Sequence, residues 1–178
     1  MADGQNRPGG ENMKKNTKYM LEIYQTKNFI VEAVNKPHIT RTDGSHIKIY
    51  PKVKILDRTK LSPELAIEYM RLTMVTGEAM AKVLNKKGID IGRINYQDNG
   101  NWSVFQPEGS YFHLHLYGRA KSSKIQKWGE MVSLPDRKDE PWYFDALEPL
   151  NSEDITEIKK EIEDIFKQEK YQDKNWHL

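Results

Sequence analysis

Two histidines separated by one residue are the part of this sequence best suited to chemistry. His113 and His115 alternate with three apolar residues, Phe112, Leu114 and Leu116. Such alternation is typical of a β-strand, because successive side chains of a strand point to opposite faces. We therefore predict a strand that buries its apolar side chains and carries both imidazole rings on the opposite, solvent-facing side.

Neighbouring imidazoles on one strand face suit two kinds of site. A neutral imidazole nitrogen can attack phosphorus and form a covalent intermediate, which splits one difficult displacement into two easier steps. Imidazole nitrogens are also common metal ligands. A metal site built on His113 and His115 would need a third ligand, such as His46 or Asp98. The pair alone does not decide between the two chemistries, and satisfied structural histidines are a third possibility.

The elements that must position this pair follow from the patterning of the chain. The β-branched and aromatic content and the spacing predict strands at 19–24, 28–34, 46–50, 89–95 and 112–117. Ser62 and Pro63 predict the start of a long helix that runs to about Lys87, where Gly88 ends it. A final amphipathic helix is predicted over 152–170.

The remaining segments differ in composition. Residues 1–15 contain almost nothing apolar, which predicts a disordered tail, and we expect one domain over residues 16–178. The connection at 119–150 lacks clean periodicity but is rich in aromatic residues, which argues against disorder. We expect Arg93, Arg119 and Lys121 to be solvated surface charges rather than phosphate ligands.

Composition and charge narrow the class of protein. The 178 residues, 37% of them apolar, fit one compact domain. The formal net charge of +2 provides no general field for a nucleic-acid polymer or an anionic membrane. Zero cysteines exclude disulfides and thiolate chemistry and suit a reducing compartment. With no leader and no apolar run of membrane-spanning length, we expect a soluble cytoplasmic protein whose partner is a small molecule.

The histidine segment resembles the signature of the histidine triad superfamily, in which three histidines alternate with apolar residues on a strand. Two segments earlier in the chain also resemble the family. Gly44–Lys52 is similar to its Gly-His-strand-Pro-Lys element, and Leu61–Glu64 is similar to the start of its long helix. Ile91–Gly100 resembles the strand and turn that carry an Asn or Gln beside the substrate phosphate. These matches span roughly Phe29 to Arg119 in family order.

This resemblance implies a fold and an activity. The fold would be α+β, with an antiparallel sheet of about five strands, a long helix packed on it and a C-terminal helix, assembled as a homodimer. The activity would be that of a nucleotide hydrolase or nucleotidyl transferase acting at an α-phosphate through a nucleotidyl-histidine intermediate. Dinucleoside polyphosphates or nucleoside phosphoramidates would be its substrates, without a cofactor or a metal ion.

The resemblance also assigns roles to individual residues. His115 and His113 would be the catalytic residues. The substrate-binding residues would be Ser110, Gln97, Asn99, His46 and Tyr117. Of these, the Ser110 hydroxyl and one of the two amides would meet the charge that develops on the phosphate oxygens.

Only two of the three triad histidines are present, and the missing one can be placed in two ways. If Ser110 matches the phosphate-contacting residue five positions before the family's nucleophile, His115 is the nucleophile and Tyr117 replaces the third histidine. If the residues after His115 match the tail that follows the third histidine, His113 is the nucleophile and Tyr111 replaces the first. We prefer the first placement and keep the second open.

Two other functions also stay open at this point. A chain that has lost one triad histidine could bind nucleotides and regulate another process, with weak turnover or none. The metal site on the histidine pair is the other alternative.

Overall fold

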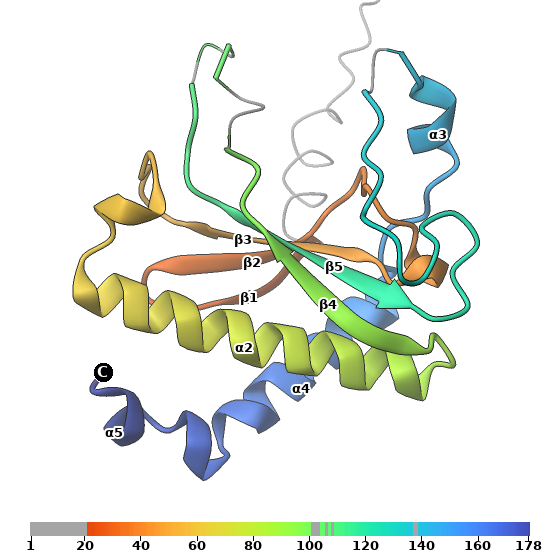
Figure 1. The fold of residues 1–178 in the computed structure, drawn as a ribbon. Helices are drawn as coiled ribbons and strands as arrows, with labels where there is room; N and C mark the ends of the chain where they lie inside the picture. The colour runs from red at the N-terminus through yellow and green to blue at the C-terminus, as the bar shows by residue number, and fades with distance from the viewer. Residues whose placement is uncertain (1–20, 101–103, 106, 108, 137–138) are drawn as a thin grey trace, which may run out of the picture.

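A five-stranded antiparallel sheet organises the computed structural model (Figure 1), which describes every residue except 1–20, 101–103, 106, 108 and 137–138. The strands are β1 (Glu22–Gln25), β2 (Phe29–Ala33), β3 (His46–Pro51), β4 (Ile91–Gln97) and β5 (Leu114–Ala120). Their order across the sheet is β1-β2-β3-β5-β4, so β5, which carries His115, lies between β3 and β4. The tail predicted at residues 1–15 lies outside the described residues.

Two helices cover one face of this sheet, as Figure 1 shows. They are α2 (Pro63–Lys86) and α4 (Ser152–Phe166). α2 begins at the predicted position because the Ser62 side chain accepts the backbone N–H of Leu65. A reciprocal capping box between Asn151 and Asp154 fixes the start of α4. Within the described part of the chain, no helix has the length and apolar content needed to cross a membrane.

The C-terminal helix is shorter than predicted. It ends at Phe166 rather than near residue 170, and a 3₁₀ turn (Glu169–Tyr171) and the short α5 (Asp173–Trp176) follow. The reason is the burial of Tyr171, which is 2% exposed and donates a hydrogen bond from its hydroxyl to Glu78 of α2. The chain has to turn back at this point to bring the ring into the core.

The hydrophobic core fills the space between the sheet and the two long helices. β3 contributes Ile47 and Ile49, and β5 contributes Leu114 and Leu116, all almost fully buried. Burying an aliphatic side chain of this size stabilises a fold by about 1.5–3 kcal/mol. The period-two pattern of both strands therefore selects which face meets the helices, and the predicted α+β fold class is confirmed.

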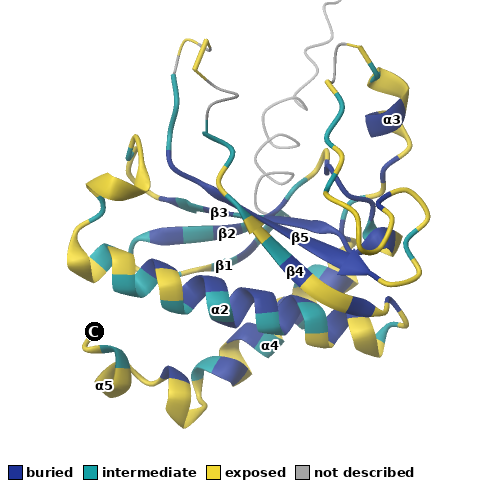
Figure 2. Ribbon diagram, viewed as in Figure 1, coloured by how far each residue is buried: buried dark blue, intermediate teal, exposed yellow. Residues whose placement is uncertain are grey.

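The opposite face of β5 is also covered, which corrects one prediction. We expected the imidazole rings on a solvent-facing surface, but every residue of β5 is buried, as Figure 2 shows by its dark colour. The residue before the strand, His113, is 8% exposed and His115 is 6% exposed. The loop before β3 lies over this face with α3 (Pro141–Asp145), where Phe144 meets the ring of His38 edge-on.

Two buried charges hold the covering segments together. The Asp43 carboxylate accepts the backbone N–H groups of residues 124–126 at 2.7–3.0 Å. The Arg119 guanidinium donates to three backbone carbonyls within residues 126–130. The expected surface role of Arg119 is therefore wrong, because the residue is only 4% exposed and organises the connection that follows β5.

Candidate active site

Strand pairing brings the histidines of distant segments together. In the register between β3 and β5, His46 lies opposite Tyr117, and Lys48 lies opposite His115. Side chains of directly opposite residues in an antiparallel pair are close enough to touch. His46, Tyr117 and His115 therefore share one face of the sheet. The ring centroid of His46 lies 4.6 Å from that of Tyr117 and 4.9 Å from that of His115.

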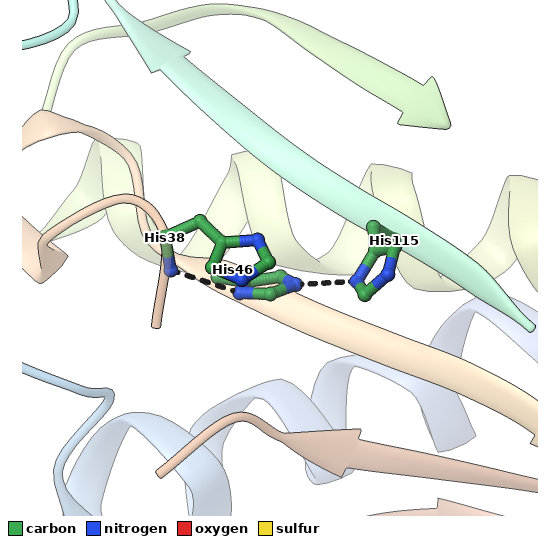
Figure 3. A group of neighbouring side chains, drawn as sticks. All are labelled: His38, His46 and His115. Atoms are coloured by element: carbon green, nitrogen blue, oxygen red, sulfur yellow. Dashed lines mark hydrogen bonds between the residues drawn. The ribbon is translucent and has the colours of Figure 1, made fainter. Parts of the chain in front are cut away.

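Three buried imidazoles form a group that we name the histidine cluster: His38, His46 and His115 (Figure 3). Nε2 of His46 lies 2.8 Å from Nδ1 of His115. The backbone N–H of His38 donates to Nδ1 of His46 at 3.2 Å, and the two rings stack with centroids 4.8 Å apart. Each ring offers a nitrogen within 4.8 Å of the others.

The backbone bond decides where the protons of this cluster lie. An amide N–H can only donate, so Nδ1 of His46 accepts and a neutral His46 carries its proton on Nε2. Nε2 of His46 therefore donates to Nδ1 of His115. A neutral His115 must then carry its own proton on Nε2.

His113 has the opposite tautomer. Its Nδ1 lies 2.9 Å from the backbone carbonyl oxygen of Tyr111, which can only accept. His113 therefore donates from Nδ1, and its Nε2 keeps a lone pair. The Tyr111 ring stacks on His113 with centroids 4.6 Å apart, and the His115 ring meets it edge-on at 4.7 Å.

Burial keeps both strand histidines neutral. Desolvation lowers the pKa of His115 to about 3, and electrostatic repulsion with His113, His38 and Lys48 acts in the same direction. Desolvation also lowers the pKa of His113, although its hydrogen bond to the Tyr111 carbonyl opposes the shift. A neutral imidazole is the form that can attack an electrophile or bind a metal ion.

The hydroxyl of Tyr117 extends the cluster on the far side of His38. It lies 2.8 Å from Nδ1 of His38 and accepts a hydrogen bond from the Asn99 side-chain amide at 3.5 Å. Tyr117 is fully buried, and this burial raises the pKa of its hydroxyl. The Tyr117 hydroxyl therefore stays protonated and is a polar group of the site.

Known proteins resemble this chain in structure but not in sequence. No protein-family model matches this sequence, and no curated protein matches it either. Among solved structures, a hypothetical histidine triad nucleotide-binding protein from Sulfolobus tokodaii strain 7 is 12% identical at a TM-score of 0.53, with 82% of this chain and 85% of that chain covered. A zinc-bound histidine triad family protein from Mycobacterium smegmatis is 20% identical at 0.52, with the same shares covered.

A third similar structure is a Hit-like protein involved in cell-cycle regulation from Bartonella henselae, 13% identical at a TM-score of 0.51, with 79% of this chain and 85% of that chain covered. At these identities the likeness concerns the fold. This chain has the histidine triad fold.

The histidine triad fold brings together most of the residues singled out from the sequence. His113, His115, His46 and Tyr117 lie side by side, and Asn99 reaches the Tyr117 hydroxyl.

The other sequence-based candidates make no hydrogen bond or ring contact with the cluster that the structure defines. Gln97 lies opposite His115 in the β4–β5 register, and Ser110 is half-buried just before Tyr111. Asp98, considered as a third metal ligand, pairs instead with Arg58 at 3.4 Å.

His38 is the member of the cluster that the sequence did not indicate. It lies in a loop without periodicity, eight residues before His46, and no motif surrounds it. The nearest signal is the Asp43-Gly44 turn, which reverses the chain so that the loop runs back over β3. That turn predicts a return of the chain but not which side chain it brings to the cluster.

Proposed function

We propose that this protein is a nucleotide hydrolase or nucleotidyl transferase that acts at an α-phosphate through a covalent nucleotidyl-histidine intermediate. The observation that carries the proposal is the bond from Nδ1 of His113 to the Tyr111 carbonyl. It leaves a neutral imidazole with its Nε2 lone pair available to attack phosphorus. The histidine triad fold, shared with a nucleotide-binding protein, supports the choice of a nucleotide as substrate.

The tautomers favour His113 over His115 as the nucleophile. Nδ1 of His115 accepts a hydrogen bond from His46, so a neutral His115 carries its proton on Nε2. Nε2 of His115 can therefore donate a hydrogen bond but has no lone pair with which to attack phosphorus. The proposal therefore takes the second placement of the triad, in which Tyr111 stands at the first position. In this role His115 offers its Nε2–H to a phosphate oxygen, where a preorganised donor stabilises developing charge.

The metal alternative requires a different protonation of the cluster. To ligate a cation through Nε2, a neutral His46 must carry its proton on Nδ1, which would then face the backbone N–H of His38. Nδ1 itself is occupied by that same N–H. The residues present therefore fit a chain of hydrogen bonds better than a three-histidine metal site.

Intact-mass spectrometry after brief incubation with a panel of nucleotides tests the proposal. The wild-type protein should gain the mass of one nucleotidyl group, a nucleoside monophosphate less one water, when the reaction is stopped in alkali, which preserves the P–N bond. His113→Ala should form no adduct. His115→Ala should still form it, about 10²–10³-fold more slowly, because it loses a donor to the phosphate but keeps the attacking atom. Adduct formation by His113→Ala would show that His113 is not the nucleophile. Loss of the adduct in His115→Ala alone would assign the nucleophile to His115.

A further inference from the structure

A cavity of about 580 Å³ lies where α2, α4 and the C-terminal segment after α4 meet β1. That segment turns back beside α2 (Figure 1), and Tyr171 fixes the return, because its hydroxyl donates to Glu78 of α2. The volume is within the range of small-molecule sites in proteins. The lining of the cavity does not include the histidine cluster, so this is a separate place in the fold.

Arg71 of α2 lines the cavity and has unused hydrogen-bond donors. A guanidinium carries five N–H groups. The two on Nη1 are used, one by the backbone carbonyl of Tyr171 at 3.0 Å and one by the Asp173 carboxylate at 2.6 Å. Nε and Nη2 have no hydrogen-bond partner among the described residues, and both reach solvent. They form a planar pair of donors that matches the two oxygens of one carboxylate.

This cation is mostly enclosed, whereas the carboxylate that pairs with it is not. The Arg71 side chain is 13% exposed and that of Asp173 is 70% exposed. Water screens an exposed carboxylate, so the pair gains little from its Coulomb attraction. The unused edge of the guanidinium is therefore the part of the cavity best suited to hold a second anion.

Aromatic rings flank the Arg71 guanidinium. It lies over the Phe166 ring, 5.2 Å from the centroid, and the Tyr24 ring stacks on Phe166 with centroids 5.7 Å apart. The Tyr24 hydroxyl has no hydrogen-bond partner within the described part of the chain. Burial and the nearby Glu163 carboxylate raise the pKa of Tyr24, against the opposing effect of Arg71, so the hydroxyl is a donor at neutral pH. The cavity thus offers apolar rings beside two sets of unused donors.

We propose that this cavity binds a small aromatic monocarboxylate. Nε and Nη2 of Arg71 hold the two carboxylate oxygens, and the flat ring of the ligand lies against Tyr24 and Phe166. Lys174 also lines the cavity and adds to its attraction for an anion. The inference is independent of the function proposed above, because it uses other residues.

The charges around the cavity favour a ligand with one negative charge over a ligand with two. Arg71 and Lys174 are positive, while Asp173 and the nearby Glu163 are negative. Because Oδ1 of Asp173 already lies 2.6 Å from Nη1, a dianion on the same guanidinium meets about twice the repulsion that a carboxylate meets. A phosphate ester therefore fits this place less well than a carboxylate.

Titration of ¹⁵N-labelled protein with benzoate, followed by NMR, tests the site. The Nε–H of Arg71 and the backbone amides of residues 171–174 should shift together, with a dissociation constant of about 1 mM for a ligand of this size. Benzamide keeps the ring without the charge, and acetate keeps the charge without the ring, so each should bind at least about 10-fold more weakly. Absence of these shifts at about 10 mM benzoate, or equal binding of acetate and benzoate, overturns the inference.

Two substitutions test the donors one at a time. Arg71→Lys keeps the positive charge but loses the planar pair of N–H groups, and it should weaken benzoate binding at least about 10-fold. Tyr24→Phe removes only the hydroxyl and should weaken binding about 2- to 10-fold. Arg58→Lys is the matched control, because Arg58 also pairs with an aspartate and lies over a phenylalanine ring but is outside the cavity, so its affinity should equal that of the wild type. Wild-type affinity in both Arg71→Lys and Tyr24→Phe would overturn the inference.

Phenyl phosphate tests the class of anion, because it carries the same ring and is largely a dianion at neutral pH. It should bind the wild-type protein more weakly than benzoate does. Asp173→Asn removes the competing charge and should narrow this difference at least about 3-fold. Tighter binding of phenyl phosphate than of benzoate by the wild-type protein would overturn the assignment of a monocarboxylate.

Discussion

Gly44 and Gly118 cross so closely that neither position has room for a side chain. A Cβ atom on Gly118 would lie 2.0 Å from the carbonyl oxygen of Gly44, and one on Gly44 would lie 2.2 Å from the carbonyl oxygen of Gly118. Gly44 also has a φ of 129°, which L-residues rarely adopt. This contact holds the loop that carries His38 against β5, since the N–H of Gly118 donates to the Ser45 carbonyl.

Gly118→Ala should destabilise the fold and separate the histidine cluster. The added methyl group meets backbone rather than a flexible side chain, and overpacking of this kind costs about 1–3 kcal/mol. Urea unfolding measures the loss. Gly100→Ala is the control, because a Cβ there makes only ordinary contacts of 3.5 Å or more, and its stability should stay within about 0.5 kcal/mol of the wild type. Equal stability of the two variants would refute the steric argument.

Asp43→Asn should loosen the connection after β5. The carboxylate accepts hydrogen bonds from the three backbone N–H groups of residues 124–126. In the variant, an NH2 group replaces one of the accepting oxygens and cannot accept a hydrogen bond from these N–H groups. A buried group left without its partner costs about 1–3 kcal/mol. Hydrogen exchange should accelerate first at these three amides. The exposed Asp145→Asn should leave them unchanged, and uniform protection in both variants would contradict the prediction.

Stability should fall as the pH drops below about 6.5, the pKa of an unperturbed histidine. The pKa of His115 in the folded state is lowered to about 3 and that of His113 is also lowered, so the unfolded chain binds protons that the folded chain does not. The contribution is complete above pH 6.5 and is lost toward the folded-state pKa, at about 1.4 kcal/mol per pH unit for each ring.

Urea midpoints measured from pH 8 to pH 5 check this slope. His115→Gln should flatten it, because one of the two rings with a lowered pKa no longer titrates in the unfolded chain. His177→Gln removes an exposed ring and should leave the slope as it is. A midpoint that rises as the pH falls, or an unchanged slope in His115→Gln, would contradict the prediction.

Tyr111→His should preserve or increase the rate of adduct formation, because the proposed assignment of His113 puts Tyr111 at the first triad position. Tyr117→His should reduce both stability and rate, since the ring is fully buried and its hydroxyl bonds His38. Stopped reactions followed by intact mass give both rates. Tyr117→Phe separates the two effects: it keeps the ring and should lose only about 0.5–1.5 kcal/mol for the hydrogen bond. A gain in Tyr117→His with a loss in Tyr111→His would restore the first placement.

The parts of the fold that could be predicted depend on local rules. The alternation around Leu114 selects the core face of β5, and the cap at Ser62 sets the start of α2, because each signal acts within a few residues. The burial of Arg119 could not be predicted, since its three carbonyl partners come from a connection without periodicity. The same holds for the covered face of β5, which depends on how loops return over the sheet.

For the candidate site, the sequence indicates which histidines take part but not where their protons lie. The pairing of His113 with His115 is visible in the sequence, and the motif around His46 placed it near them. Which nitrogen carries each proton is a property of three-dimensional contacts. It depends on the Tyr111 carbonyl for His113 and on the His38 amide for His46, and no residue type encodes either one.

The group that orients His46 is a main-chain amide, so it belongs to position 38 rather than to histidine. Any residue except proline would supply the same N–H. A relative could therefore replace this side chain completely and still keep the protons of the two deeper rings in the same places. The backbone conformation at position 38, and not its side chain, sets the positions of the protons in this site. Comparison of residue identities alone would not detect this relationship.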